Sequence, residues 1–489
     1  MSGEKFNSCD FDLSLKEINQ LTSEEESVHT PRERNIQDDK EDILKNDAAS
    51  PAIFKLDIDC FHEIFDWLQL HDVTSFGRTC KRLQQVAGDF YRSNYVSKRI
   101  IAESGGYILY HDLNIFTPYI EKISICGNNS EVYDFVGIKC KSIREIRLGN
   151  NLPEDAIERI KNVLKKVEVI EMNECTFRQE FYEYFLKQCP KLKKLSVKRS
   201  YKIRNKAIII GSDNDWLLRK YPTLEHIELT DIYEFQMNEL NNFFELNHNV
   251  RSLSIDSASL EANQDLFLSS NTKLEKLTVE FSSQNLSKPV NDLLAQLHER
   301  NFFKHLLVYF RFDPQENLEQ MFAMPFSTSL ESLNFEIPWP NRMINIDICS
   351  KNLKVLGINN ANKILNIEAL PRKLPNLEKI YFGEANPKEI WPFICGSVKL
   401  KTIKILNMVH SDGIYSFSEF PDVQKMNEKR KMLAGARKVV IYICERLLLV
   451  SKWAKKATNL DLIELRRFES IEWNDLNSHF RHNHSKHYF

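Results

Sequence analysis

The chain has 489 residues, of which 42% are hydrophobic and 27% are charged, and its formal net charge is −2. At roughly 150 residues per domain, this length predicts about three domains, or fewer if the chain is a solenoid that grows by repetition. Gly accounts for only 14 residues, under half the usual share of roughly 7%, which argues against collagen, glycine-rich linkers and turn-dense β-barrels. The small net charge argues against nucleic-acid binding through bulk electrostatics.

The ten cysteines are scattered from Cys9 to Cys444 without any C-x-x-C spacing, so we expect reduced thiols rather than a disulfide scaffold. Residues 1–20 lack the apolar segment of a signal peptide. The most apolar late segment, residues 439–450, is interrupted by Glu445 and Arg446, so we expect no membrane-spanning helix. These features predict a soluble protein of the cytoplasm, the nucleus or both.

Residues 1–50 differ from the rest of the chain in composition. They carry 13 acidic and 6 basic side chains, a net charge of −7, which leaves +5 on the remaining 439 residues. So few apolar side chains cannot offset the entropy of ordering the segment, so we expect a disordered acidic tail. A short linear motif near Leu13 to Leu21, or at Thr30-Pro31, is the alternative.

Residues 51–96 are predicted to form two or three short helices. One face carries four apolar residues, Ile64, Phe65, Leu68 and Leu70. Asp72 is a candidate N-cap for the second helix, and Gly88 is a candidate end for the third. About 40 residues make a core too small to be stable alone, so this unit is expected to pack on a partner or on the next domain. A connecting segment, residues 97–118, follows.

A pattern of three apolar positions, spaced as the first, fourth and sixth residues of a hexapeptide, recurs through residues 119–474. Intervals between first positions run from 23 to 32 residues, which is too regular for chance. Amphipathic stretches such as residues 153–167, 177–188 and 289–300 lie between them, so each unit is predicted to be a strand, a turn and a helix. The twelve clearest matches begin at Ile120, Ile143, Val167, Leu192, Leu224, Val250, Leu274, Phe303, Leu330, Leu353, Leu377 and Leu400.

The late part of this region allows two interpretations. Residues 421–457 could form one long helix, but the β-branched and aromatic residues 439–443 favour a strand. Fitting Val439 and Ile441 to the fourth and sixth positions puts the first at Ala436, and Leu460 begins a further unit 24 residues later. This brings the total to fourteen strands. Periods of 20–29 residues with this spacing are typical of leucine-rich repeats. The predicted fold is therefore an α/β leucine-rich-repeat solenoid, with parallel strands on the concave face and helices on the convex face, preceded by a small all-α unit.

The sequence offers no recognisable catalytic or cofactor motif. It has no P-loop, dinucleotide fingerprint, H-E-x-x-H, G-x-S-x-G or EF-hand loop, so we expect neither catalysis nor a cofactor. Residues 427–431 form a basic run, for which a solvated helix face and a nuclear import signal are both open. Residues 475–489 are expected to be a disordered polar tail, with adventitious metal binding as the alternative for its histidines, His479, His482, His484 and His487.

Residues 56–95 resemble an F-box, a motif with a Leu-Pro opening, an apolar helix, a Leu-x-Asp turn and a Cys-Lys-Arg helix. Asp57 stands where that family usually has Pro, and Leu83 stands where Trp or Phe is common. The resemblance implies that the unit binds an SKP adaptor through Leu56, Phe61, Ile64, Phe65, Leu68, Leu70, Val73, Cys80 and Leu83. With the repeats behind it, the chain resembles an F-box/leucine-rich-repeat protein, the substrate receptor of an SKP–cullin–F-box ubiquitin ligase.

This resemblance implies a non-catalytic subunit that reaches a cullin and RING ligase through the adaptor and holds a protein substrate on the concave face. Because exposed aromatic and basic residues are enriched in binding hot spots, we expect the substrate to contact His305, Tyr309, Tyr381, Lys404, Tyr442 and Arg466. The mildly basic body suits acidic or phosphorylated protein segments. Two alternatives stay open: a scaffold protein whose degenerate F-box joins no ligase, and an enzyme or enzyme inhibitor built on the solenoid.

Overall fold

The computed structural model describes residues 52–467, apart from 97–98, 104–113, 128, 150–151, 154, 174, 176–180, 199–214, 231–239, 282–287, 312–314, 337–342, 347, 410–419, 421 and 454–457. The predicted acidic tail and the His-containing tail lie outside these residues. The chain divides into two units, residues 1–57 and 58–489. The described part of the first unit contains one 3-10 turn, η1 (Ala52–Lys55).

The second unit begins with three helices, α2 (Ile58–Phe65), α3 (Leu70–Gly77) and α4 (Lys81–Asn94). Asp72 is not an N-cap, because α3 begins two residues earlier after Gln69; Asp72 instead lies in the first turn, where its negative charge favours the helix dipole. Gly88 does not end α4 either. A Cβ atom at Gly88 would lie 2.5 Å from Cε2 of Tyr119, so this glycine serves close packing rather than termination.

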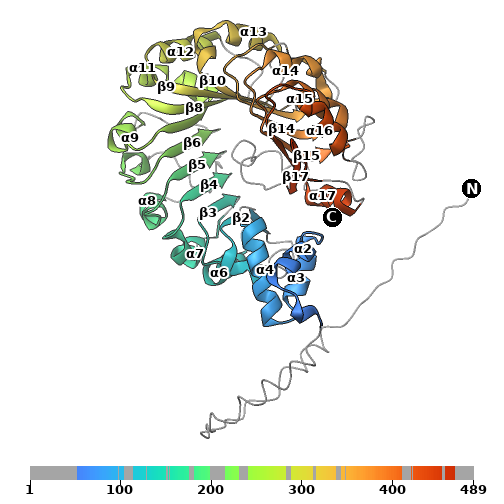
Figure 1. Ribbon diagram of the computed structural model, residues 1–489. Coiled ribbons are helices and arrows are strands. Elements are labelled where there is room, and N and C mark those ends of the chain that lie inside the picture. Colours follow the sequence, from blue (N-terminus) through green and yellow to red (C-terminus); the bar gives the residue numbers. More distant parts are fainter. Residues whose placement is uncertain are drawn as a thin grey trace, which may run out of the picture. The chain divides into compact units, whose positions relative to one another are not determined.

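Fifteen parallel strands follow one another in sequence order within a single sheet (Figure 1). The fourteen predicted strands are all present, and β1 adds one more within the predicted connecting segment. They are β1 (Ile100–Glu103), β2 (Lys122–Cys126), β3 (Glu145–Gly149), β4 (Val169–Asn173), β5 (Lys194–Lys198), β6 (His226–Thr230), β7 (Ser252–Asp256), β8 (Leu274–Phe281), β9 (Phe303–Phe310), β10 (Leu330–Phe335), β12 (Val355–Asn360), β14 (Lys379–Ala385), β15 (Thr402–Met408), β16 (Val439–Ile443) and β17 (Ile463–Arg467). A separate two-stranded sheet pairs β11 (Ile344–Asn345) with β13 (Ile364–Leu365).

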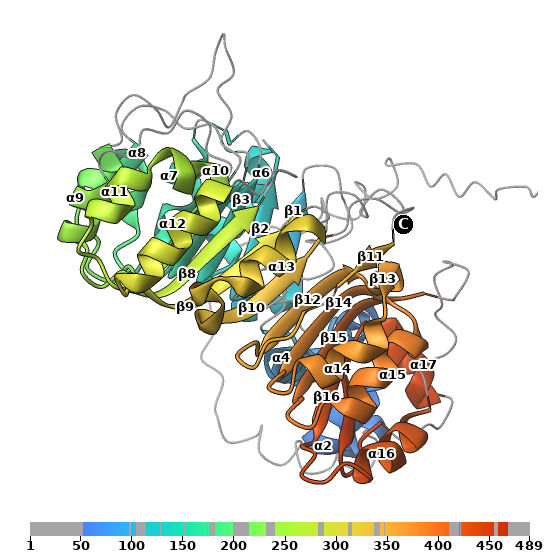
Figure 2. The same ribbon diagram turned by 90° about the horizontal axis from the view of Figure 1, so that it is seen from above.

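Helices between the strands cover one face of the long sheet (Figures 1 and 2). They are α6 (Ser130–Lys139), α7 (Ala156–Leu164), α8 (Phe181–Tyr184), α9 (Leu240–Leu246), α10 (Ser257–Ala262), α11 (Gln264–Ser269), α12 (Lys288–Glu299), α13 (Gln315–Ala323), α14 (Leu370–Lys373), α15 (Pro387–Gly396), α16 (Val423–Lys431) and α17 (Glu445–Trp453). Short 3-10 turns add to them at η2 (Asn114–Tyr119), η3 (Leu186–Gln188), η4 (Asp215–Leu218), η6 (Pro325–Ser329), η7 (Ala361–Lys363) and η8 (Ile367–Ala369). We call the other face of the sheet the inner face. A strand and its helices repeat along the chain, an arrangement compatible with a solenoid.

The repeat frame of β16 differs between its two neighbouring strands. Val439 and Ile441 pair with Ile463 and Leu465 of β17, which confirms the predicted fourth and sixth positions. On the other side, Ile441 pairs with Ile403 of β15, which is two residues out of that frame. Val439, Ile441 and Ile443 are fully buried, and side chains on one face of a strand recur every two residues, so hydrophobicity alone cannot distinguish the two frames. A register shift also separates β9 from β10, where Leu333 pairs with Val308.

Charged residues of alternating sign mark the beginnings of the strands. The residue after each first repeat position is acidic or basic in strict alternation over twelve repeats, and we call this set the charge ladder: Glu121, Arg144, Glu168, Lys193, Glu225, Arg251, Glu275, Lys304, Glu331, Lys354, Glu378 and Lys401. Backbone hydrogen bonds of 2.7–2.9 Å join successive members at nine of the eleven steps. Ion pairs join Lys193 to Glu168 (2.7 Å) and Lys354 to Glu331 (2.8 Å). Each ladder residue except the first and the last therefore has a residue of opposite charge on both sides.

Candidate functional site

The three N-terminal helices share an aromatic core. Phe65 lies at its centre, with its ring centroid 5.2 Å from that of Phe76 and 5.3 Å from that of Phe90. Phe61 contacts both Phe65 and Phe76, at centroid distances of 6.2 and 5.9 Å. Edge-to-face and tilted ring pairs of this kind add to the stabilisation that burial provides, so this small unit has a core of its own.

The nine residues expected to contact an adaptor separate into two groups. Phe65 and Leu70 were expected to be exposed to an adaptor, and this prediction is wrong: both side chains are buried in the core of the short helices. Five residues are buried: Phe61, Phe65, Leu70, Val73 and Leu83. The other four are partly or largely accessible: Leu56, Ile64, Leu68 and Cys80.

Three exposed apolar residues of this helical unit form what we call the apolar ridge: Ile58, Ile64 and Trp67, with Ile64 and Trp67 38% and 42% exposed. Ile58 and Ile64 lie on α2, and Trp67 follows in the turn at its end. Sequence reasoning missed Trp67 and Ile58, although Ile64 and Trp67 have the three-residue spacing that marks one helix face. Large apolar side chains gathered on a small helical unit indicate a contact surface for another protein.

The inner face of the first strands carries buried charges in mutual contact. Arg99, just before β1, has a side chain only 2% exposed, and its guanidinium lies 2.9 Å from Glu171 of β4 and also contacts Glu145 of β3. Lys198 of β5 lies 2.6 Å from Glu228 of β6. We call these five residues the inner ion network. Buried charges persist where each has a partner of opposite sign, so this part of the inner face is held together by its own side chains.

The pKa values within the inner ion network reflect these pairings. Burial alone would raise the pKa of Glu171, but the neighbouring cations, Arg99 first, hold it well below its ordinary value. The same balance of burial against Lys198 and Lys194 lowers the pKa of Glu228. Both carboxylates therefore stay ionised at neutral pH, which suits electrostatic cross-linking of strands rather than proton transfer.

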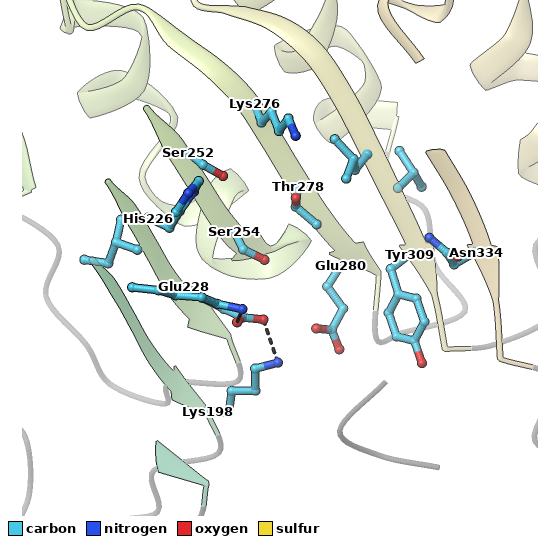
Figure 3. A pocket seen from close by; sticks show the side chains of 14 residues that line it. Lys198, His226, Glu228, Ser252, Ser254, Lys276, Thr278, Glu280, Tyr309 and Asn334 are labelled. Carbon is cyan, nitrogen blue, oxygen red and sulfur yellow. Dashed lines mark ion pairs between the residues drawn. The ribbon is translucent and has the colours of Figure 1, made fainter. Parts of the chain in front are cut away.

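A hollow of about 270 Å³ opens on the inner face across β5 to β10 (Figure 3). Its floor is low because Ser252 and Ser254 of β7 and Thr278 of β8 have short side chains. Longer polar side chains surround that floor, and they are Lys194, Lys198, His226, Glu228, Lys276, Glu280, Tyr309 and Asn334. A second hollow of about 400 Å³ shares Lys276 and Leu307 with the first and extends to Tyr381 of β14. Together they form a polar groove with hydroxyl, ammonium and carboxylate groups, which suits a polar protein segment.

The residues expected to contact a substrate are less exposed than the sequence indicated. Tyr309, Tyr381 and Lys404 are buried, His305 and Tyr442 are half-buried, and Arg466 is exposed. The structure brings four of the six into one row, because Tyr381, Lys404, Tyr442 and Arg466 are register partners across β14 to β17. The Lys404 ammonium lies 5.7 Å from the Tyr381 ring centroid and 5.3 Å from that of Tyr442, so these side chains cover one another. Tyr309 lines the central hollow instead, and His305 lies 3.3 Å from Glu331.

Within the described part of the chain, no three His, Cys, Asp or Glu side chains gather as a metal site would require. The four histidines of the C-terminal tail lie outside that part. None of the described helices has the length and apolarity needed to cross a membrane.

Comparison with known proteins bears on the helical unit. Residues 53–93 match the family model of the F-box domain, which confirms the resemblance seen in the sequence. No curated protein matches the chain significantly. Among solved structures, the chain is similar to the crystal structure of the Rad7 and Elc1 complex in yeast, with a TM-score of 0.36 and 14% identity over 82% of this chain and 97% of that chain.

An F-box domain implies binding to an adaptor of the SKP type, and F-box proteins are generally non-catalytic substrate adaptors. The chain therefore carries an F-box domain at residues 53–93, followed by a region of helices and a long parallel sheet.

Proposed function

We propose that the chain is the substrate-recognition subunit of an SKP–cullin–F-box ubiquitin ligase. It binds the SKP adaptor through the F-box domain and a protein substrate on the inner face of the sheet. It contributes no catalytic group of its own; holding substrate and ligase together raises their effective concentration.

The apolar ridge carries the adaptor half of this proposal. Ile58, Ile64 and Trp67 remain exposed although the unit has formed a complete aromatic core from Phe61, Phe65 and their neighbours. An amphipathic helix with an exposed apolar edge suits association with a groove on another protein. Leu68, which is partly accessible, extends the proposed contact, whereas the buried members of the nine act through the fold of the unit.

The polar groove supports the substrate half. Three of its basic side chains, Lys194, His226 and Lys276, come from the early positions of β5, β6 and β8. Lys198, Glu228 and Glu280 lie farther along their strands. Asn334 is 2% exposed, and its Oδ1 has no hydrogen-bond partner within the described part of the chain. A substrate segment with both charged and hydrogen-bonding side chains would suit this lining. Tyr442 of β16 and Arg466 of β17, which are register partners, form a second proposed contact area at the end of the sheet.

We also infer that the region after the F-box domain is a leucine-rich-repeat array. Its support is the repeated apolar hexapeptide at intervals of 23–32 residues together with one parallel strand in each unit. The cytoplasm, the nucleus or both remain the proposed location, on the evidence of the cysteine pattern alone.

Adaptor binding can be tested on the full chain with the double variant Ile64→Ala/Trp67→Ala. We expect at least a tenfold loss of adaptor affinity, because both side chains would be buried at the contact. Ile138→Ala is the matched control, since Ile138 is an equally apolar, exposed residue on α6, far along the chain. An unmodified chain that captures proteins but neither the SKP adaptor nor cullin would favour the scaffold alternative.

A further inference from the structure

The last strand of the sheet reaches back to the F-box domain. Nη2 of Arg467, at the end of β17, donates to the carbonyl oxygen of Asp66 at 2.8 Å and to those of Phe65 and Leu68 at 3.4 and 3.3 Å. These carbonyls belong to the end of α2 and the turn behind it, where a helix leaves acceptors without intrahelical donors. One guanidinium thus caps a helix that lies about 400 residues earlier in the sequence.

Two further contacts join the same elements. Arg467 donates from Nη1 to the hydroxyl of Tyr95, which in turn donates to Glu445 of α17; Arg467 also lies 3.4 Å from Glu445. Lys452 of α17 lies 3.2 Å from Asp66, and its ammonium is 5.7 Å from the Trp67 ring centroid. We call these residues the clasp: Asp66, Tyr95, Glu445, Lys452 and Arg467.

The clasp is sheltered from solvent. The side chain of Arg467 is only 10% exposed, and its guanidinium lies 5.7 Å from the ring centroid of Phe90 and 5.5 Å from that of Tyr95. Burial, followed by the charge of Glu445, raises the pKa of the Tyr95 phenol, so it stays a hydrogen-bond donor. Ion pairs and hydrogen bonds in such surroundings are stronger than those at a wet surface, and removing one partner leaves the others unsatisfied.

We propose that the clasp fixes the F-box domain to the end of the sheet, so that a bound adaptor is held at a set position relative to the inner face. In a chain of repeats, each unit normally contacts only its neighbours, and the last unit has a neighbour on one side only. The clasp gives β17 and α17 a second neighbour, the F-box domain. Because coupling between sites is reciprocal, adaptor binding on the F-box domain stabilises β17, and loss of the clasp loosens α2.

The contact between the clasp and the F-box domain lies within this chain and does not depend on the proposed function. Only the expected effect of adaptor binding on β17 rests on that function. The apolar ridge and the clasp meet at Trp67, whose ring lies near the Lys452 ammonium and is still 42% exposed. The other ridge residues, Ile58 and Ile64, present exposed side chains, and Arg467 holds main-chain carbonyls beyond them. Adaptor and clasp can therefore engage the same helix together.

Hydrogen exchange of the full chain tests the clasp without an adaptor. In Arg467→Ala we expect amides near residues 58–70 and 460–467 to exchange about tenfold faster, because three carbonyls and a carboxylate lose their contact with the guanidinium. Arg466→Ala is the matched control: it removes the same charge from the adjacent residue, whose side chain is 54% exposed and faces Glu464. Tyr95→Phe, which deletes one hydroxyl, should give a smaller change in the same two segments if Arg467→Ala fails to fold.

Faster exchange in residues 460–467 alone, or equal effects of Arg466→Ala and Arg467→Ala, would overturn the proposal. With an SKP-type adaptor bound, exchange in residues 460–467 should slow in the unmodified chain and stay unchanged in Arg467→Ala. If the unmodified chain binds no adaptor, the proposed function fails while the adaptor-free result still decides whether the clasp exists. If it binds adaptor without any slowing at β17, the coupling is wrong and the adaptor proposal stands.

Discussion

The inner ion network and the charge ladder are built from the same kinds of side chain, Arg, Lys and Glu, but the first is buried and the second is largely exposed. In the network, Arg99 and Glu171 have side chains only 2% and 4% exposed, and they are 2.9 Å apart. In the ladder, Lys354 and Glu331 are similarly close, at 2.8 Å, but their side chains are 48% and 24% exposed. A buried pair must keep both partners, whereas an exposed pair contributes little on its own. The difference in burial therefore gives the two sets different roles. The buried charges of the inner ion network hold particular strands together, and the exposed charges of the ladder favour the observed order of the strands.

A third kind of charge sharpens this contrast. Glu389 of α15 is 7% exposed, and its carboxylate accepts hydrogen bonds from N and Nδ2 of Asn386 at 2.7 and 2.5 Å in a capping box. Burial raises its pKa to about 7, although the bonds from Asn386 work in the opposite direction. Glu171 and Glu389 are thus both buried carboxyls, but only Glu171 has a cation beside it.

The largest expected effect is the loss of a charge from the inner ion network. Glu171→Ala should cost about 3–5 kcal/mol of unfolding free energy, because it leaves Arg99 buried with half of its charge compensation. Denaturant unfolding measures this loss. Glu158→Ala removes a carboxylate that is 72% exposed and should change stability by less than about 0.5 kcal/mol. Equal losses in the two variants would show that Arg99 and Glu171 are not a buried pair.

A smaller, pH-dependent effect is expected at Glu389. Its folded-state pKa lies above the unfolded value of 4.5, so the stability it contributes is complete below about pH 4.5 and is lost as the pH rises to about 7. The unmodified chain should lose roughly 2 to 3 kcal/mol of unfolding free energy at this site between pH 5 and 8, and the neutral isostere, Glu389→Gln, should not. Denaturant unfolding at several pH values measures this. A difference in unfolding free energy between the variant and the unmodified chain that stays constant with pH would contradict the prediction. Glu171, whose pKa is lowered, acts in both proteins and cancels from the comparison.

The smallest effect is expected in the charge ladder. Lys354→Glu would add a carboxylate between those of Glu331 and Glu378, so that three lie side by side. It should lower the unfolding free energy by about 1 kcal/mol or less at low salt. High salt should remove most of this loss, because exposed charges are screened. Lys351→Glu changes an exposed neighbour outside the ladder and is the matched control. A loss that salt does not reduce would mean that Lys354 acts through packing.

The repeat pattern of the sequence predicted the strands better than it predicted the site. Apolar residues at fixed spacing report burial directly, so all fourteen strands were recovered, including the one at Val439–Ile443. The same signal could not tell whether Phe65 faces its own core or a partner, since both environments favour Phe. Nor could local spacing show that Arg99 meets Glu171, 72 residues later, or that Arg467 meets Asp66, 401 residues earlier. The charge ladder was visible in the sequence, but only after the repeats had been aligned column by column.

The central claim is that one chain joins an adaptor to a substrate through two separate surfaces. Affinity capture of three full-length chains from cells treated with a proteasome inhibitor tests it most directly: unmodified, Ile64→Ala/Trp67→Ala, and Lys276→Glu, which reverses a charge in the polar groove. We expect the ridge variant to lose the SKP adaptor and cullin while keeping the other captured proteins, and the groove variant to lose some of those proteins while keeping the adaptor. Retention of the adaptor by the ridge variant, or loss of both classes of partner by either variant at unchanged thermal stability, would contradict the account.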